Sequence, residues 1–293
     1  MLISLFRTMR PKQWTKNIFI FAALVFDEKL FIPELLARTV AAFVLFCLLS
    51  GTVYLINDLV DMEKDRQHPA KRHRPLASGQ LKPTVAVAAA VLIPLVSLPL
   101  SFVLQPLFGV VALSYLAVMV AYSFVLKNIV IIDVLTIAAG FVLRVAAGAI
   151  VVEVERFSPW LYVCMTLLAL FQGFGKRRHE LVVLEESANE HRPILNEYSL
   201  QLLDEMIAVV SSATVVAYSL YTFSAPNLPG NHAMMLTIPF VLYGIFRYLY
   251  LMHFKKEGGS PEEILFKDRP LLIDLGLWSL AVIVIMYYDH ILS

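Results

Sequence analysis

Between Lys82 and Lys127 the chain runs for 44 residues without a single Asp, Glu, Lys or Arg. About 20 apolar residues span the hydrocarbon core of a bilayer as one helix, so this stretch has the length of two spans. We expect the break between them near Leu104-Gln105-Pro106, because proline interrupts a helix. The stretch indicates a protein that crosses a membrane more than once.

The whole chain has 293 residues, 59% hydrophobic and 16% charged, and its other apolar runs repeat this pattern. Its apolar runs predict nine spans: roughly 17–33, 36–56, two within 82–127, 130–152, 158–175, one on either side of 224–230, and 271–288. We therefore predict an all-α integral membrane protein, a bundle of nine transmembrane helices. The bundle is expected to form a single polytopic domain over residues 1–293, with loops that cap its cytoplasmic end.

Basic residues gather in the N-terminal segment and in the loops that follow the second, sixth and eighth predicted spans. By the positive-inside rule, the N-terminus and these loops are expected to be cytoplasmic and the C-terminus to lie outside. Cys47 and Cys164 both fall in apolar runs, so we interpret them as core residues rather than as a disulfide.

The stretch from Asn57 to Gly79, directly after the second span, carries the strongest chemical signal. Asp58, Asp61 and Asp65 stand at i, i+3 and i+7, so the three carboxylates share one helical face. They would repel one another at a helix C-terminus unless a cation joined them. We predict a Mg²⁺ site there, with Asn57 as a neutral oxygen ligand or orienting group. The alternative is a solvated, charged helix end.

A basic cluster follows the acids and contains Lys71, Arg72 and Arg74. Carboxylates that hold a hard cation beside arginine and lysine suit a metal-bound polyphosphate. The alternative is a basic patch that only sets the membrane topology. Tyr122 and Lys127, at the cytoplasmic end of the fourth span, indicate on their own an aromatic belt residue and a lysine that reaches to the membrane interface.

Two further groups stand at or near the predicted spans. Asp133 and Arg144 lie in the fifth span, where ionisable groups are costly and usually functional. They share a face but lie about 16 Å apart, so they cannot pair with each other and point to a polar cavity or to ion pairs with other helices. Lys176-Arg177-Arg178-His179-Glu180 ends the sixth span and is predicted to form a second wall of an anion site.

These motifs resemble the first aspartate-rich motif of the UbiA superfamily of intramembrane prenyltransferases. Further features are similar to the branch of that superfamily that transfers phosphoribosyl groups to decaprenyl phosphate. They are Arg10-Pro11-Lys12-Gln13-Trp14-x-Lys16-Asn17, His68-Pro69-x-Lys71-Arg72-x-Arg74-Pro75, Tyr122-x-x-x-Leu126-Lys127, and Gly175-Lys176-Arg177 with Glu180-Leu181. Ordinary members carry a second aspartate-rich motif where this chain has Lys176 to Glu180, a basic replacement that fits a donor with an additional phosphate.

The resemblance implies a Mg²⁺-dependent phosphoribosyltransferase of the bacterial cytoplasmic membrane. It would transfer 5-phosphoribosyl from phosphoribosyl diphosphate to a polyprenyl phosphate, release pyrophosphate, and make a lipid-linked pentose precursor for cell-envelope glycan. We expect no nucleic-acid partner, and a homo-oligomer is compatible with the sequence. The implied catalytic residues are Asp58, Asp61, Lys127 and Arg144, and the implied metal ligands are Asp58, Asp61 and Asp65. The implied phosphate-binding residues are Lys16, Asn57, Lys71, Arg72, Arg74, Tyr122, Lys127, Lys176, Arg177 and Glu180.

Two other functions remain open at this point. The first is prenyl transfer from a prenyl diphosphate to an aromatic acceptor, which the aspartate motif would serve equally well. The second is a membrane transporter or lipid-phosphate carrier that uses Asp133 and Arg144 as intramembrane sites. The basic motif at Lys176 to Glu180 favours the sugar donor over the first, and the aspartate triad disfavours the second.

Overall fold

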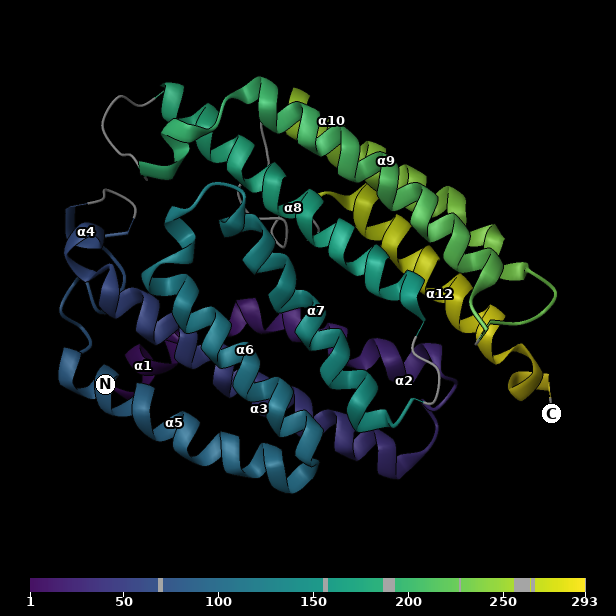
Figure 1. Ribbon diagram of the computed structural model, residues 1–293, viewed down its shortest axis with the longest axis horizontal. Coiled ribbons are helices and arrows are strands. Elements are labelled where there is room, and N and C mark those ends of the chain that lie inside the picture. Colours follow the sequence, from purple (N-terminus) through teal and green to yellow (C-terminus); the bar gives the residue numbers. More distant parts are fainter. Residues whose placement is uncertain are drawn as a thin grey trace. The chain divides into compact units, whose positions relative to one another are not determined.

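A computed structural model describes residues 1–67, 71–154, 158–186, 193–226, 228–255, 264 and 267–292 (Figure 1). Within these ranges the regular structure is α-helix and 3₁₀-helix, without a strand. The chain separates into two compact units. Unit 1 comprises Met1–Leu24 with Lys29–Val154, and unit 2 comprises Val25–Glu28 with Glu155–Ser293.

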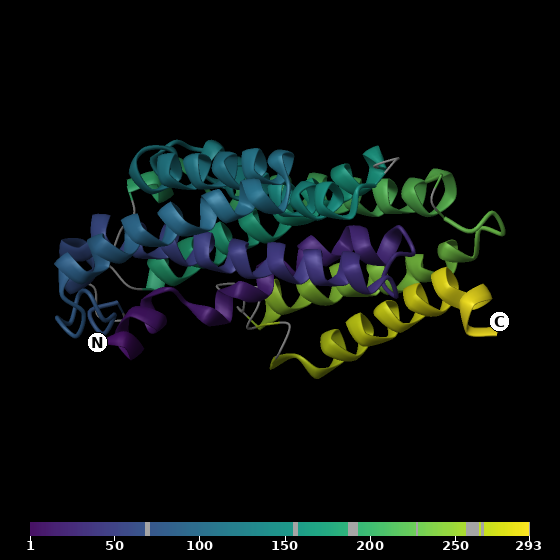
Figure 2. The same cartoon turned by 90° about the horizontal axis from the view of Figure 1, so that it is seen from below.

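Unit 1 is arranged around its longest helix, α3 (Pro33–Val60). The helix packs against α5 (Pro83–Leu104), α6 (Pro106–Phe124) and α7 (Ile132–Val152), and α5 lies beside it in Figure 2. The shorter elements are α1 (Leu2–Thr8), η1 (Pro11–Phe21), α2 (Ala22–Phe26), α4 (Met62–Gln67) and η2 (Leu126–Asn128). Because α3 is apolar on every side, it can be buried between several helices at once.

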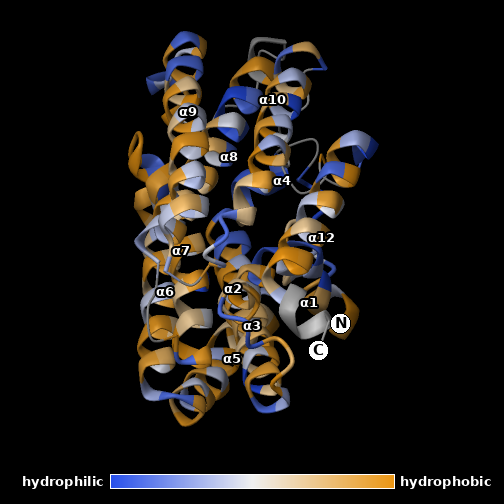
Figure 3. Cartoon of the chain, turned by 90° about the vertical axis from the view of Figure 1, so that its right-hand side faces the viewer, coloured by the Kyte–Doolittle hydropathy of each residue, from blue (hydrophilic) through white to orange (hydrophobic). Residues whose placement is uncertain are grey.

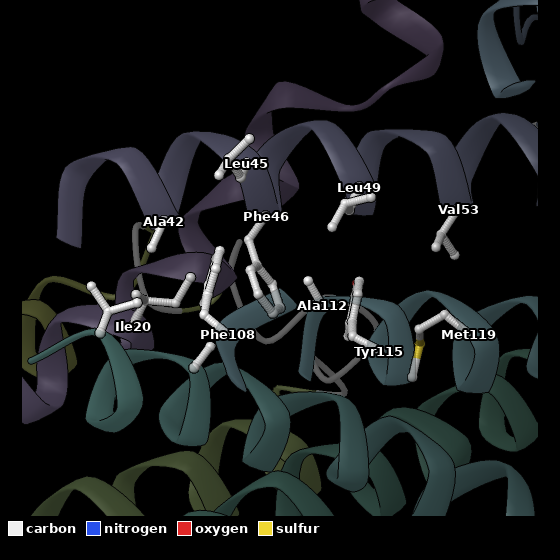
Figure 4. Close-up of a cluster of buried hydrophobic side chains, with 12 residues drawn as sticks. Ile20, Ala42, Leu45, Phe46, Leu49, Val53, Phe108, Ala112, Tyr115 and Met119 are labelled. Carbon is white, nitrogen blue, oxygen red and sulfur yellow. The ribbon is translucent and has the colours of Figure 1, made fainter. Parts of the chain in front are cut away.

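The core of unit 1 lies along α3 and α6 (Figure 4). The ring of Phe46 has its centroid 5.8 Å from that of Phe108 and 5.1 Å from that of Tyr115. Ala42, Leu49 and Ala112 fill the space around these rings, and all three are buried. Aromatic side chains bury the largest areas, so this cluster supplies much of the packing between the two helices.

The 3₁₀-helix η1 and the short α2 run antiparallel to α3. At one end Arg10, just before η1, contacts Asp58 near the end of α3. In the middle, buried Asn17 contacts Cys47 and Ser50. At the other end Lys29 donates hydrogen bonds to carbonyl oxygens at the end of α7. The segment therefore follows α3 along most of its length.

Unit 2 is a second helical assembly. Its elements are α8 (Pro159–Glu186), η3 (Pro193–Glu197), α9 (Leu200–Ser224), η4 (Ala233–Thr237), α10 (Ile238–Phe254) and α12 (Arg269–Leu292). The hydroxyl of Tyr218 on α9 bonds Thr237 Oγ1 at 2.6 Å and accepts a bond from Trp278 Nε1 at 2.9 Å. These bonds satisfy a buried hydroxyl and join α9, η4 and α12.

Seven helices in the described part of the chain are long and apolar enough to cross a membrane: α3, α5, α6, α7, α9, the segment from η4 through α10, and α12. Hydrophobic residues cover long stretches of α3, α5 and α6 in Figure 3. Large apolar side chains on α5 are exposed, including Val91, Leu95 and Val103, which suits a lipid-facing surface. The predicted all-helical membrane fold is thus confirmed.

The predicted break in the long apolar stretch is confirmed, since α5 ends at Leu104 and α6 begins at Pro106. Cys47 and Cys164 are free and buried, as predicted. The first predicted span differs in form, because residues 11–26 make a 3₁₀-helix followed by one short α-helix. The sixth predicted span corresponds to α8, which carries Lys176 to Glu180 and continues beyond them. The count of nine and the single domain remain predictions.

Candidate active site

The three aspartates lie at the end of α3 and on α4. Asp58 is in the last turn of α3, Asp61 caps that helix, and Asp65 is on α4. Backbone bonds from Asp61 N to Asn57 O (3.0 Å) and from Asp65 N to Asp61 O (2.8 Å) continue the helical spacing across the junction. Asp58 and Asp65 are 1% and 4% exposed, so their charges need partners.

Three cations from three separate segments meet these carboxylates. Arg10 Nη2 lies 2.5 Å from Asp58 Oδ1, and Arg74 Nη1 lies 3.2 Å from the same oxygen and 2.6 Å from Asp65 Oδ2. Lys127 Nζ binds both oxygens of Asp61, at 2.8 and 2.9 Å. We call these six residues the acid–cation cluster. It balances three negative charges with three positive ones.

The loop after α4 places Arg74 through its own small core. Leu76 and Leu81 are buried against Met9 and Leu55, so the loop is fixed by apolar contacts rather than by its charges. Leu81 N donates to Pro75 O at 2.8 Å. Gly79 sits between them at φ 79°, a conformation that favours glycine in a tight turn. The guanidinium of Arg74 is thereby directed at the acids.

Lys127 reaches Asp61 from the short η2 turn between α6 and α7. Its side chain is only 9% exposed, so its charge is largely withdrawn from water and is compensated by the two bonds to Asp61. The structure thus places the amine of Lys127 on Asp61, and its phosphate-binding and catalytic roles stay predictions.

The other residues proposed for unit 1 differ in exposure. Lys16, Asn57, Lys71 and Tyr122 are partly buried. Arg72 is exposed and donates to its neighbour His73 at 3.4 Å, while Arg74 takes the position against the acids. Glu63 is exposed and pairs with Arg66. His68 and Pro69 lie outside the described residues.

Arg144 is placed in the interior of unit 1, where it binds neutral groups. Its Nε donates to Asn17 Oδ1 at 2.7 Å, its Nη1 to Gly140 O at 2.7 Å, and its Nη2 to Tyr115 Oη at 2.9 Å. The guanidinium also lies 4.7 Å from the centroid of the Tyr115 ring. None of these contacts is with Asp133, which agrees with the separation along the helix. They join α6, α7 and η1 rather than reaching the acid–cation cluster.

The basic motif on α8 belongs to unit 2. Arg177, 1% exposed, donates to Glu180 Oε2 at 2.5 Å, so Glu180 is bound by Arg177 at i, i+3, in addition to lying on the face of Lys176 at i, i+4. Arg178 binds Asp204 on α9, also at 2.5 Å. The motif is thus built of ion pairs within α8 and between α8 and α9. Its predicted phosphate-binding role stays a prediction.

The acid–cation cluster has the donor chemistry that a Mg²⁺ ion requires, since carboxylate oxygens are its preferred protein ligands. In the described ranges no group of three or more His, Cys, Asp or Glu side chains is arranged to hold a metal as it stands. The reason is visible in the contacts, because each aspartate is engaged by Arg10, Arg74 or Lys127. A metal would share or take over these oxygens.

Arg10 is the member of the cluster that the sequence did not predict as a site residue. It stands 48 positions before Asp58, and no helical spacing relates the two. The available signal was its place at the start of the motif from Arg10 to Asn17, one of the features that carry the family resemblance.

These features define an all-helical integral membrane protein with buried carboxylates and cations at the end of its central helix. The model of the UbiA prenyltransferase family matches residues 17–266, and the chain belongs to this family. It is 33% identical over 304 residues to a decaprenyl-phosphate phosphoribosyltransferase of Mycolicibacterium smegmatis, covering 97% of this chain and 93% of the relative. It is 31% identical to one of Mycobacterium tuberculosis, covering 94% and 92%.

Solved structures share the fold at lower identity. A UbiA homolog from Archaeoglobus fulgidus bound to GPP and Mg²⁺ is 18% identical, with a TM-score of 0.74 over 97% of this chain and 99% of the other. The apo structure of a UbiA homolog from Aeropyrum pernix K1 is 14% identical, with a TM-score of 0.65 over 94% and 98%. These likenesses establish the helical architecture.

Proposed function

We propose that this protein transfers a 5-phosphoribosyl group from phosphoribosyl diphosphate to a polyprenyl phosphate and releases pyrophosphate. The observation that carries the proposal is the likeness, over nearly the whole chain, to decaprenyl-phosphate phosphoribosyltransferases. The acid–cation cluster supports it, because carboxylates and fixed cations together suit a metal-bound diphosphate. The product would be a lipid-linked pentose, a precursor for cell-envelope glycan.

Mg²⁺ is the proposed cofactor, held by Asp58, Asp61 and Asp65. Bound there, it supplies charge stabilisation to the diphosphate as that group leaves. The A. fulgidus homolog bound to GPP and Mg²⁺ supports a divalent ion in this fold. Asp58 and Asp61 are then catalytic through the charges that they hold in place.

The reaction breaks the bond between ribose C1 and the diphosphate oxygen and forms one between C1 and an oxygen of the lipid phosphate. The bonding electrons leave with pyrophosphate. Arg74 and Lys127, which already converge on the aspartates, are proposed to bind phosphate oxygens and stabilise this charge. The lipid phosphate is largely dianionic at neutral pH, its second pKa being about 6, so no strong general base is required.

The remaining roles follow the predicted residue set. Lys16, Asn57, Lys71, Arg72, Tyr122 and Glu180 are proposed to take part in phosphate binding. Lys127, Lys176 and Arg177 are the candidates for the 5-phosphate of the donor or for the lipid phosphate. For Arg144, predicted as catalytic, the contacts with Asn17 and Tyr115 favour a positioning role instead.

We infer nine crossings, with the N-terminus and the acid–cation cluster cytoplasmic and the C-terminus outside. The segment of η1 and α2 has 11 and 5 residues. At about 2.0 Å per residue for a 3₁₀-helix and 1.5 Å for an α-helix, it extends about 30 Å, the thickness of the hydrocarbon core. A short segment can therefore serve as the first span, and α8 would serve as the sixth.

The test is to incubate purified protein and Mg²⁺ with labelled phosphoribosyl diphosphate and a polyprenyl phosphate. Label is expected in the lipid fraction together with pyrophosphate in solution. The second candidate is prenyl transfer to an aromatic acceptor, favoured by the homolog structure with bound GPP. Product formed only from a prenyl diphosphate and an aromatic acceptor would overturn the proposal. A transporter or lipid-phosphate carrier would release no pyrophosphate.

A further inference from the structure

Arg10 is held in the acid–cation cluster while part of its side chain stays accessible. Its Nη2 lies 2.5 Å from Asp58 Oδ1, and its guanidinium lies 4.8 Å from the centroid of the Tyr54 ring. The side chain is 30% exposed, against 2% for that of Asp58. A guanidinium carries five N–H groups, and the hydrogen bond to Asp58 uses one of them. The group is thus fixed in orientation and able to bind a further anion.

The backbone around Arg10 is fixed as well. Arg10 has φ 52° and ψ 66°, a left-handed conformation that is strained for a residue with a side chain. Met9 before it is buried against Leu55, and Met9 O accepts a hydrogen bond from Trp14 Nε1 at 3.2 Å. These contacts hold the turn between α1 and η1 in place. A strained residue kept by its surroundings at a charged cluster is a mark of function.

The η1 segment that follows Arg10 is clamped against α7 at two points. At the first, Arg144 on α7 donates to Asn17, which itself donates to Ser50 on α3 at 3.3 Å. At the second, Gly148 lies so close to the carbonyl of Ile20 that a Cβ on the glycine would overlap that oxygen. The hydrogen bonds fix η1 along its axis, and the close approach fixes its distance from α7. We call this pair of contacts the η1 clamp.

We propose that Arg10 binds a phosphate of the donor substrate, and that the η1 clamp positions it to do so. The inference rests on the proposed function, in which Asp58 helps to hold a metal-bound diphosphate. The guanidinium of Arg10 is at hydrogen-bond distance from that carboxylate, so it would lie next to a diphosphate held there. Its planar fork suits two phosphate oxygens at once. Arg144 is then a positioning residue that acts through Asn17.

The first experiment measures binding of Mg²⁺ with phosphoribosyl diphosphate to the purified full-length protein by calorimetry. Arg10→Gln is expected to weaken the Kd about 10- to 100-fold, the loss of one or two charge-assisted hydrogen bonds. Arg10→Lys is expected to fall between, because it keeps the charge and loses the fork. The matched control is Arg7→Gln, an exposed arginine three residues earlier, which is expected to leave the Kd unchanged.

A Kd and a KM for the donor within twofold of wild type in Arg10→Gln would overturn the role of Arg10. Failure of the proposed function is a separate result, namely wild-type protein that transfers no phosphoribosyl group. Calorimetry with Mg²⁺ and inorganic pyrophosphate then still reports on Arg10, since that probe contains the diphosphate alone. An unchanged pyrophosphate Kd in Arg10→Gln counts against the inference in either case.

The second experiment tests the clamp by a double-mutant cycle. Asn17→Ala is expected to weaken donor binding, and to cause no further loss when Arg10 is already Gln, because it acts through that residue. Tyr115→Phe is the milder test, because it removes one hydrogen-bond acceptor of Arg144 and keeps the packing of the ring. It is expected to raise the donor Kd a few-fold when Arg10 is present and to have no effect in Arg10→Gln. Losses that add in the double variants would overturn the clamp, and melting temperatures identify any variant that has lost its fold.

Discussion

Asp61 differs from its two neighbours in the way its charge is met. Both of its oxygens bind the single cation Lys127, whereas Asp58 and Asp65 are bridged by Arg74. Removing one partner of a buried ion pair leaves the other charge uncompensated. Asp61 therefore orients Lys127 and, in the proposed function, also holds Mg²⁺.

Asp61→Asn is expected to lower phosphoribosyl transfer on the order of 10²- to 10³-fold, because it removes one metal-binding charge and the partner of Lys127. Label transfer to lipid measures the activity, and size-exclusion profiles and melting curves in detergent measure folding, which is expected to persist. The control is Glu63→Gln, since Glu63 is exposed and pairs with Arg66 away from the cluster. Near-normal turnover in Asp61→Asn would remove the metal assignment.

Asp268 gives a pH-dependent contribution to stability in unit 2. The hydrogen bonds from Arg247, at 2.7 and 3.1 Å, lower the pKa of the Asp268 carboxyl, and the backbone of Leu271 adds a further bond. A lowered folded-state pKa means that the unfolded chain binds the proton more readily. The stabilisation is therefore present above the unfolded pKa of about 4 and is lost as the pH falls through the folded pKa.

Asp268→Asn keeps a side-chain oxygen that can accept a hydrogen bond from Arg247 or from the backbone of Leu271, and it removes the negative charge. At pH 7 it is expected to lower the melting temperature by roughly 2–4 °C. The difference from wild type is expected to shrink as the pH drops below about 4. Thermal unfolding in detergent across this range is the measurement, and a difference that grows on acidification would contradict the assigned sign.

Some residues of the site are brought together by local helical spacing, and others by contacts between segments far apart in the sequence. The common face of Asp58, Asp61 and Asp65 follows from helical spacing, which needs no knowledge of the rest of the fold. Arg10 reaches the same cluster from 48 positions away, a tertiary contact that no periodicity encodes. The sequence predicts that basic residues lie beside the acids, but it does not show that Arg74 rather than Arg72 contacts them. That depends on how the loop is fixed by the burial of Leu76 and Leu81.

The same contrast between local and tertiary determinants applies to whole helices, and it explains why the form of the first predicted span could not be predicted. Pro106 ends one helix and begins another by local chemistry, so the break before it could be predicted. The 3₁₀ form of η1 depends on α7, where Gly148 allows the backbone of Ile20 to approach and Arg144 binds Asn17. The sequence of residues 17–33 contains neither of these partners. The hydrophobic pattern gives the position of the span and leaves its geometry to packing.

Gly148→Ala tests this approach directly. The added Cβ would overlap the carbonyl oxygen of Ile20, a backbone atom that cannot rotate away. Over-packing of this kind costs about 1–3 kcal/mol, so we expect a lower melting temperature and, through the displaced η1, weaker donor binding. The control is Gly276→Ala on α12, where an added Cβ would point into open space, with no atom of another element within 4 Å.

Gly276→Ala is expected to be neutral or to stabilise the protein by about 0.5–1 kcal/mol, since alanine is the better helix former. Equal melting temperatures for Gly148→Ala and wild type would show that η1 can move away from α7. In that case the η1 clamp would not be the constraint on Arg10 that we propose.

For the whole molecule, the path of the chain across the membrane follows from unit 1. Arg10 and Asp58 are in contact, so the N-terminal segment and the end of α3 share one side. α3 has 28 residues and is about 42 Å long, so its start near Glu34 lies on the other side. In the proposed nine-span topology the chain crosses once between Arg10 and α3, and η1 with α2 is the segment proposed to cross.

Single cysteines test this path in a background where Cys47 and Cys164 are replaced by serine, which keeps an acceptor for Asn17 at position 47. A membrane-impermeant maleimide is expected to label Glu34→Cys in intact cells. It is expected to label Ile3→Cys and Ser78→Cys only after permeabilisation. All three positions are exposed, and the positive-inside rule places Ile3 and Ser78 in the cytoplasm.

Labelling of Ile3→Cys together with Glu34→Cys would show that η1 and α2 do not cross. Labelling of Ser78→Cys in intact cells would reverse the orientation, and with it the side on which phosphoribosyl diphosphate must be supplied.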